Sequence, residues 1–206
     1  IGFQSSNHNS RAYDHRLPRL ISLIGLPGSG KSTVGRHLAR RLHLPFVDSD
    51  TEIEQRIGEP VRSYFEREGE ASFRELEHEV IDQLTRWHDG VLATGGGAVL
   101  WPDNRKALHT RSTVVYLRSV PEELFRRMRH DTQRPLLQVR DPLGRLRELY
   151  AQRDPLYRET AHFTIETGRP SVASLVNMIL MQLELAGVVD ASVAPSPVDA
   201  YDPGRT

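Results

Sequence analysis

The residue types best suited to chemistry are concentrated in one glycine-rich segment, Gly25–Thr33, which fits the pattern G-x-x-x-x-G-K-[ST]. An apolar run at 20–24 precedes it, and apolar residues at helical spacing follow it. Between a strand and a helix, such a loop binds phosphate, because its backbone N–H groups wrap the anion and the helix presents the positive end of its dipole. The segment therefore predicts a phosphate-binding loop, in preference to a simple glycine-rich turn.

Lys31 and Ser32 supply the polar side chains of this loop. We expect the Lys31 ammonium to contact the β- and γ-phosphates and the Ser32 hydroxyl to coordinate Mg²⁺. The chain has 27 lysine and arginine residues, of which only Lys31 and Lys106 are lysines. A compact ammonium at Lys31 suits a phosphate cradle that a planar guanidinium does not fit. The expected nucleotide-binding residues of the loop are Gly28, Ser29, Gly30, Lys31, Ser32 and Thr33.

Two acids and three glycines follow other expected strands. Asp48 and Asp50 come after a short strand, where Asp48 could hold Mg²⁺ through water and Asp50 could point at a substrate hydroxyl. Acids in a first helical turn are also favoured by the helix dipole without any function. Gly95, Gly96 and Gly97 end another strand, which indicates either close approach of a substrate or a tight turn.

Two arginines far apart in the sequence are candidates for binding one carboxylate. Arg74 lies on an expected helix with Glu77 three residues later, a spacing that is also typical of a solvated salt bridge. Arg153 follows a second helix. Together, Arg74 and Arg153 could hold a carboxylate through bidentate hydrogen bonds.

A segment at about 129–142 is polar, contains arginine and is interrupted by two prolines. A mobile arginine loop above a phosphate loop excludes water and neutralises the transferred phosphoryl group, so Arg134 is the candidate for this role. A solvated basic face is the alternative, and we favour it for Arg126 and Arg129.

The elements that must position these residues alternate between strand and helix. Apolar patterning predicts strands at 20–24, 45–48, 91–94, 113–117 and 162–166. It predicts helices after the phosphate loop, from a capping box at Ser49–Glu52, and at about 71–87, 103–108, 121–128, 143–150 and after Ser171. This alternation indicates a parallel sheet with helices on both faces and ligands at the carboxyl ends of its strands.

Composition narrows the class of protein. The 206 residues suggest one domain at 19–187, with residues 1–18 and 188–206 expected to be disordered extensions. The 27 acidic and 27 basic residues balance, so neither nucleic acid nor a membrane is an expected partner. The absence of cysteine excludes disulfides and thiolate chemistry, and no apolar run approaches the ~20 residues of a membrane span. A cytoplasmic enzyme is expected.

Taken together, these motifs closely resemble the shikimate kinase family over about residues 20–180. The matching pieces are Gly25–Thr33, Asp48–Asp50, Phe73-Arg74 with Glu77, Gly95–Ala98, Arg134–Leu137 and Arg153–Tyr157. The resemblance implies transfer of the γ-phosphoryl group of ATP to the 3-hydroxyl of shikimate, in aromatic amino-acid biosynthesis. It also implies a three-layer α/β/α fold of the nucleoside-monophosphate-kinase type, with five parallel strands in the order 2-3-1-4-5 and a lid formed by the segment at about 129–142, and it implies a monomer.

The resemblance also implies a role for each matching residue on the shikimate side. Asp50 would bind the shikimate hydroxyls and orient or deprotonate the nucleophile. Arg74 and Arg153 would hold the carboxylate, Glu77 would steady Arg74, and the glycines 95–97 would line the substrate pocket.

On the ATP side, the resemblance makes Arg134 the lid arginine that reaches the phosphates, and Ser32 with Asp48 the magnesium shell. Arg127 and Arg169, in the turn 167–170, would lie at the adenine. Two alternatives stay open: another small-molecule kinase of this fold, such as a gluconate-type kinase, and a sensor domain without turnover.

Overall fold

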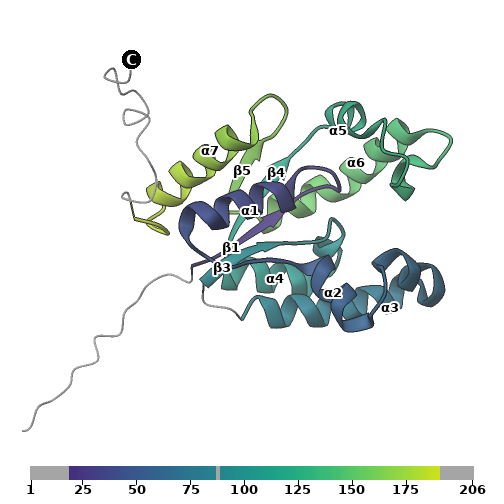
Figure 1. Ribbon diagram of the computed structural model, residues 1–206, viewed down its shortest axis with the longest axis horizontal. Helices are drawn as coiled ribbons and strands as arrows, with labels where there is room; N and C mark the ends of the chain where they lie inside the picture. Colours follow the sequence, from purple (N-terminus) through teal and green to yellow (C-terminus); the bar gives the residue numbers. More distant parts are fainter. Residues whose placement is uncertain (1–18, 87–88, 191–206) are drawn as a thin grey trace, which may run out of the picture.

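The computed structural model describes residues 19–86 and 89–190, and these form an α/β domain built on one sheet (Figure 1). The expected extension at 1–18 and residues 191–206 of the expected tail lie outside the described residues. No helix within the described ranges is long and apolar enough to cross a membrane.

The elements alternate along the chain as the sequence predicts. The strands are β1 (Arg19–Ile24), β2 (Phe46–Asp48), β3 (Asp89–Ala93), β4 (Thr113–Arg118) and β5 (Phe163–Glu166). The helices are α1 (Lys31–Leu42), α2 (Ser49–Ile57), α3 (Val61–Leu84), α4 (Pro102–Arg111), α5 (Pro121–Met128), α6 (Pro142–Thr160) and α7 (Val172–Leu185). Two 3-10 turns, η1 (Ala98–Leu100) and η2 (Pro135–Leu137), complete the described elements.

The sheet has the strand order β2-β3-β1-β4-β5, and every pairing is parallel, which confirms the expected fold class. Side chains alternate between the two faces, as the pleat requires. In β1, Leu20 and Ile24 pack with the helices α2 to α6, whereas Ile21 and Leu23 pack with α1 and α7. The sheet is therefore the middle of three layers (Figure 1), and β1 lies at its centre.

Two helices differ from the sequence prediction. Helix α3 is divided by a break at Gly69, whose φ of 84° and ψ of 171° are not helical. The part after the break matches the helix expected from about residue 71, whereas the part from Val61 to the break is a helical segment that the sequence did not predict. Helix α6 continues to Thr160 instead of ending near Tyr150, and it contains Pro155. The interruption at Gly69 agrees with the low helix propensity of glycine. Proline also favours interruption, so packing of the flanking turns against the core maintains α6 through Pro155.

The start of α2 corrects the expected capping box. Asp48, one residue before Ser49, is the N-cap, and its Oδ1 accepts from the N–H groups of Asp50 and Thr51 at 2.9 and 3.3 Å. The Ser49 hydroxyl is instead buried and accepts from the Gly95 N–H at 3.0 Å. Ser49 therefore links α2 to the end of β3.

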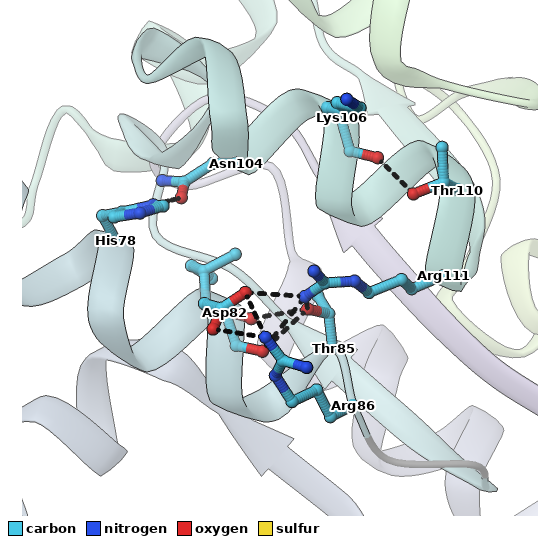
Figure 2. Close-up of polar contacts among 9 residues, drawn as sticks. His78, Asp82, Thr85, Arg86, Asn104, Lys106, Thr110 and Arg111 are labelled. Atoms are coloured by element: carbon cyan, nitrogen blue, oxygen red, sulfur yellow. Dashed lines mark hydrogen bonds and ion pairs between the residues drawn. The ribbon is translucent and has the colours of Figure 1, made fainter.

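Helices α3 and α4 are joined by polar side chains along their contact (Figure 2). At one end, the Asp82 carboxylate accepts from Arg86 at 3.0 Å and from Arg111 at 2.8 Å. At the other, the buried Asn104 contacts His78 Nδ1 at 2.8 Å and donates to the Ala98 carbonyl at 3.0 Å. These contacts fix α3 relative to the loop that follows β3.

The chain stays packed just past the expected domain end at residue 187. Gly187 has a φ of 71° and reverses the chain after α7. Val188 and Val189 are then buried in the apolar layer of α1 and α7. The packed domain therefore reaches at least Val189.

Candidate active site

A cavity of about 730 Å³ opens at the carboxyl ends of the strands, where the parallel sheet predicts ligand binding. Its walls come from the phosphate loop, the start of α2, the end of β3, α5, the lid and the β5–α7 loop. Its lining includes the predicted residues Gly28, Ser29, Gly30, Lys31, Ser32, Thr33, Asp48, Asp50, Gly95, Gly96, Arg127 and Arg134.

The phosphate loop has the backbone conformation that its glycines predict. Gly28 and Gly30 have φ values of 82° and 94°, which side chains rarely adopt. Gly30 is the N-cap of α1 and supplies no capping side chain. The first N–H groups of α1 therefore have no side-chain partner, as an anion site requires.

Lys31 is buried at the base of this loop. Its Nζ donates to the carbonyls of Gly25 and Leu26, both at 2.9 Å. Burial lowers the pKa of Lys31 to about 8, although the nearby carboxylates of Asp50 and Asp48 oppose the shift. A phosphate would stabilise the charged form of this amine.

Ser32 and Asp48 meet across the cavity, since the Ser32 hydroxyl donates to Asp48 Oδ2. The other oxygen of Asp48 caps α2, so the capping and metal-binding interpretations of this residue are compatible. Within the described ranges, no group of three or more His, Cys, Asp or Glu side chains could hold a metal. One hydroxyl and one carboxylate fit Mg²⁺, which usually takes few protein ligands and completes its shell with phosphates and water.

Asp50 lies on the first turn of α2, where other acids surround it. Burial, together with the charges of Asp48 and Glu77, raises its pKa to about 6, while Lys31 opposes the rise. A Cβ at Gly95 would lie 2.8 Å from Asp50 Oδ1 and 3.0 Å from Glu77 Oε2. Glycine at 95 therefore permits close packing of two acids.

Arg74 is held by Glu77 in a buried pair. Arg74 Nη1 lies 2.7 Å from Glu77 Oε1, and Glu77 is only 1% exposed, so the pair is not the solvated salt bridge considered above. Burial raises the pKa of Glu77, and Arg74 opposes that rise. The Arg74 guanidinium lies directly against Gly97, where a Cβ would overlap it. Gly97 therefore leaves the space that Arg74 occupies.

Arg153 projects from α6 toward the same acid. Its Nε is buried and has no hydrogen-bond partner among the described residues. Its charge lowers the pKa values of Glu77, Tyr157 and Lys31, so it is close to all three. Arg74 also acts on Glu77 and Tyr157. Arg74 and Arg153 therefore converge around Glu77, just outside the residues that line the cavity.

The lid presents one arginine to the cavity. Arg134 is half-buried among the lining residues, and its Nε lies 2.8 Å from Asp131 Oδ2. Arg126 and Arg129 are exposed and do not line the cavity, which fits the solvated face expected for them.

Arg127 joins two walls of the cavity. It donates to the carbonyl of Gly28 at 3.3 Å and to that of Thr167 at 3.2 Å. Arg169 is exposed and does not line the cavity, whereas its neighbours Gly168 and Pro170 do. Of the two arginines expected at the adenine, the structure brings only Arg127 to the cavity.

Comparison with known proteins agrees with this geometry. The model of the family described as shikimate kinase matches residues 27–184. The chain belongs to the shikimate kinase family. It is 65% identical to the shikimate kinase of Paracidovorax citrulli, covering 84% of this chain and 97% of that one. It is 60% identical to the shikimate kinase of Ralstonia nicotianae, covering 86% and 93%.

A solved structure shows a similar fold. The shikimate kinase from Acinetobacter baumannii, in complex with shikimate, superposes with a TM-score of 0.78 at 46% identity. The match covers 85% of this chain and 97% of that one. The three-layer architecture of this shikimate kinase family member is therefore that of a relative solved with shikimate bound.

Sequence reasoning missed several residues of the site. The β5–α7 side of the cavity includes, besides the expected turn 167–170, the residues Ser171, Val172 and Leu175, which the strand-end rule could have indicated because they follow the fifth strand. Met128 lies directly beneath Gly28 and would collide with a Cβ there. A lone methionine at the end of a short amphipathic helix carries no sequence signal for such a contact.

Proposed function

We propose that this site phosphorylates the 3-hydroxyl of shikimate with ATP, as the activity of the family requires. ATP is the co-substrate and Mg²⁺ the metal in this family. The observation that carries the assignment is the position of Asp50. It lies between the phosphate-loop cavity and the arginine pair around Glu77, so one carboxylate adjoins both halves of the site.

The donor half binds the nucleotide. The backbone of the loop and Lys31 hold the β- and γ-phosphates, and Ser32 and Asp48 hold Mg²⁺, which neutralises the charge of the phosphates. The apolar side chains of Val172 and Leu175, with Arg127 above Gly28, form a wall suited to the adenine. Arg134 closes from the lid over the transferred group and excludes water.

The acceptor half binds shikimate. Arg74 and Arg153 take the carboxylate, and Glu77 holds Arg74 in the bound geometry. With a pKa of about 6, Asp50 is mainly ionised at neutral pH and accepts a hydrogen bond from the 3-hydroxyl. The hydroxyl oxygen then forms a bond to the γ-phosphorus, the bond from that phosphorus to the β–γ bridging oxygen breaks, and the hydroxyl proton passes to Asp50 as ADP leaves.

We propose a cytoplasmic monomer without nucleic-acid or membrane partners. The balanced charge of the chain gives no reason to expect a nucleic-acid or anionic-membrane partner, and the monomer follows from the family resemblance.

The decisive experiment incubates the protein with ATP, Mg²⁺ and shikimate and follows shikimate 3-phosphate by mass spectrometry. Asp50→Asn should lower kcat about 10²–10³-fold while the fold is retained, since a positioned group of this kind has effects of that size. Near-normal turnover by Asp50→Asn would contradict its assignment. Gluconate in place of shikimate tests the gluconate-type alternative, and shikimate binding without turnover would support a sensor domain.

A further inference from the structure

Helix α6 is weakened at the turn that carries Arg153. Pro155 lacks a backbone N–H, so it cannot form the usual bond to the carbonyl four residues earlier, at Ala151. Arg153 therefore projects from a turn whose own backbone bonding is incomplete. Something outside the helix must fix the direction of its guanidinium.

Two buried tyrosines anchor this turn to the ends of two strands. The Tyr157 hydroxyl donates to the Gly96 carbonyl at 2.6 Å, which joins α6 to the glycine segment after β3. The Tyr116 hydroxyl, from β4, donates to Asp154 Oδ1 at 2.7 Å. The two rings pack together with centroids 4.9 Å apart and are fully buried.

The anchors lie on either side of Pro155 and close to Arg153. Asp154 is the next residue after Arg153, and Tyr157 is one helical turn further on the same face. Burial raises the pKa of Tyr157, and the adjacent Arg153 opposes that rise. Tyr157 therefore remains a neutral donor to Gly96 at physiological pH.

We propose that Tyr157 is a positioning residue, which sets the direction of Arg153 for the substrate carboxylate by tying α6 to Gly96, with Tyr116 and Asp154 as a second anchor. Arg153 touches the substrate in this scheme and Tyr157 does not. The inference rests on the proposed function, because it assumes that Arg153 binds a carboxylate.

The variant Tyr157→Phe removes the hydroxyl and keeps the ring that packs on Tyr116. We expect the KM for shikimate to rise roughly fivefold to tenfold, which corresponds in size to the loss of one buried hydrogen bond. The KM for ATP and kcat should stay within about twofold, because the donor half does not depend on this anchor. Thr160→Val is the matched control, since Thr160 is buried on the same helix and its hydroxyl donates to the Leu156 carbonyl within that helix; its KM values should be unchanged.

Combining Tyr157→Phe with Arg153→Ala tests whether the tyrosine acts through the arginine. We expect Tyr157→Phe to change the KM for shikimate less than about twofold in the Arg153→Ala background. The same fivefold rise in both backgrounds, or an equal rise in the KM for ATP, would overturn the proposal.

Two checks keep the outcomes distinct. If the unmodified protein does not phosphorylate shikimate, the proposed function fails and this inference fails with it; if it does and Tyr157→Phe leaves the KM for shikimate unchanged, the inference alone fails. If Tyr157→Phe does not fold, as judged by circular dichroism and Tm, Tyr116→Phe is measured in the same two backgrounds. An unchanged KM for shikimate in folded Tyr116→Phe would then overturn the proposal.

Discussion

The two halves of the site are constructed differently. The phosphate site of the donor half is formed by nine consecutive residues, 25–33, whose backbone conformation creates the binding surface. The acceptor half collects side chains from α2, α3, the loop after β3 and α6, which are more than 100 residues apart at their extremes. A local turn fixes this phosphate site, whereas only the packing of separate elements fixes the acceptor half. Substitutions should therefore affect the two halves in different ways.

The largest effect is expected from Lys31→Arg in the donor half. The guanidinium does not fit the buried position of Lys31 between the loop carbonyls and the phosphates, so kcat should fall at least about 10²-fold. Steady-state kinetics measure this fall. Lys106→Arg, at the exposed second lysine on α4, is the matched control and should be near normal. Full activity of Lys31→Arg would contradict the requirement for a compact ammonium at this position.

Arg74→Ala should weaken the acceptor half alone. We expect the KM for shikimate to rise about tenfold to a hundredfold, with the KM for ATP within twofold, because the lost contact binds both ground and transition states. Tm should also fall, since Glu77 loses its buried partner. Arg62→Ala, which breaks only an exposed pair with Glu66, serves as the control. A change confined to the KM for ATP would remove the distinction between the halves.

Gly97→Ala tests whether packing against Gly97 contributes to the position of Arg74, in addition to its pair with Glu77. The φ of −93° at Gly97 is open to alanine, so the expected effect comes from collision of the new Cβ with the guanidinium. The KM for shikimate should rise roughly fivefold to tenfold. In an Arg74→Ala background the same substitution should be nearly neutral, and an undiminished effect there would point to a backbone cause instead.

The smallest effect concerns stability and pH. Because the folded-state pKa of Asp50 is raised to about 6, its ionised form is disfavoured by folding, and stability falls as pH rises from about 4 to 6. Asp50→Asn should therefore raise Tm above pH 6 by a few degrees, equivalent to about 1–2 kcal/mol, and should not raise it near pH 4. Thermal unfolding of the ligand-free protein at both pH values measures this difference. A Tm gain at pH 4 as large as at pH 8 would show that the charge is not its cause.

The same contrast explains what the sequence could predict. The donor half and the alternation of strands and helices are encoded in local patterns, and the structure matches them. Residues at strand ends were also found, because parallel sheets gather ligands at one edge. The strand order came from the family resemblance, since local patterns do not specify which strands pair.

Tertiary contacts account for what local rules could not supply. The rules predicted a cap at Ser49, but the Ser49 hydroxyl accepts a hydrogen bond from Gly95 in another part of the fold. They also predicted the end of a helix near Tyr150, but α6 continues past Pro155, where Tyr116 and Tyr157 bind the flanking residues to the rest of the fold. The sequence could not predict whether the Arg74–Glu77 pair is functional, because the same spacing is also typical of a solvated salt bridge. Its meaning depends on burial, which is known only once α3 is placed against Gly97.

The buried amine of Lys31 also has a consequence for chemical labelling. Because burial lowers the pKa of Lys31 to about 8, its amine is more often neutral and nucleophilic near pH 8 than that of an exposed lysine, and the residue lines the cavity. An amine-acylating reagent small enough to enter should therefore modify this position, and bound ATP should protect it. Because the chain has only one other lysine, peptide mass spectrometry of this single acylation would report how much of the enzyme is occupied by nucleotide.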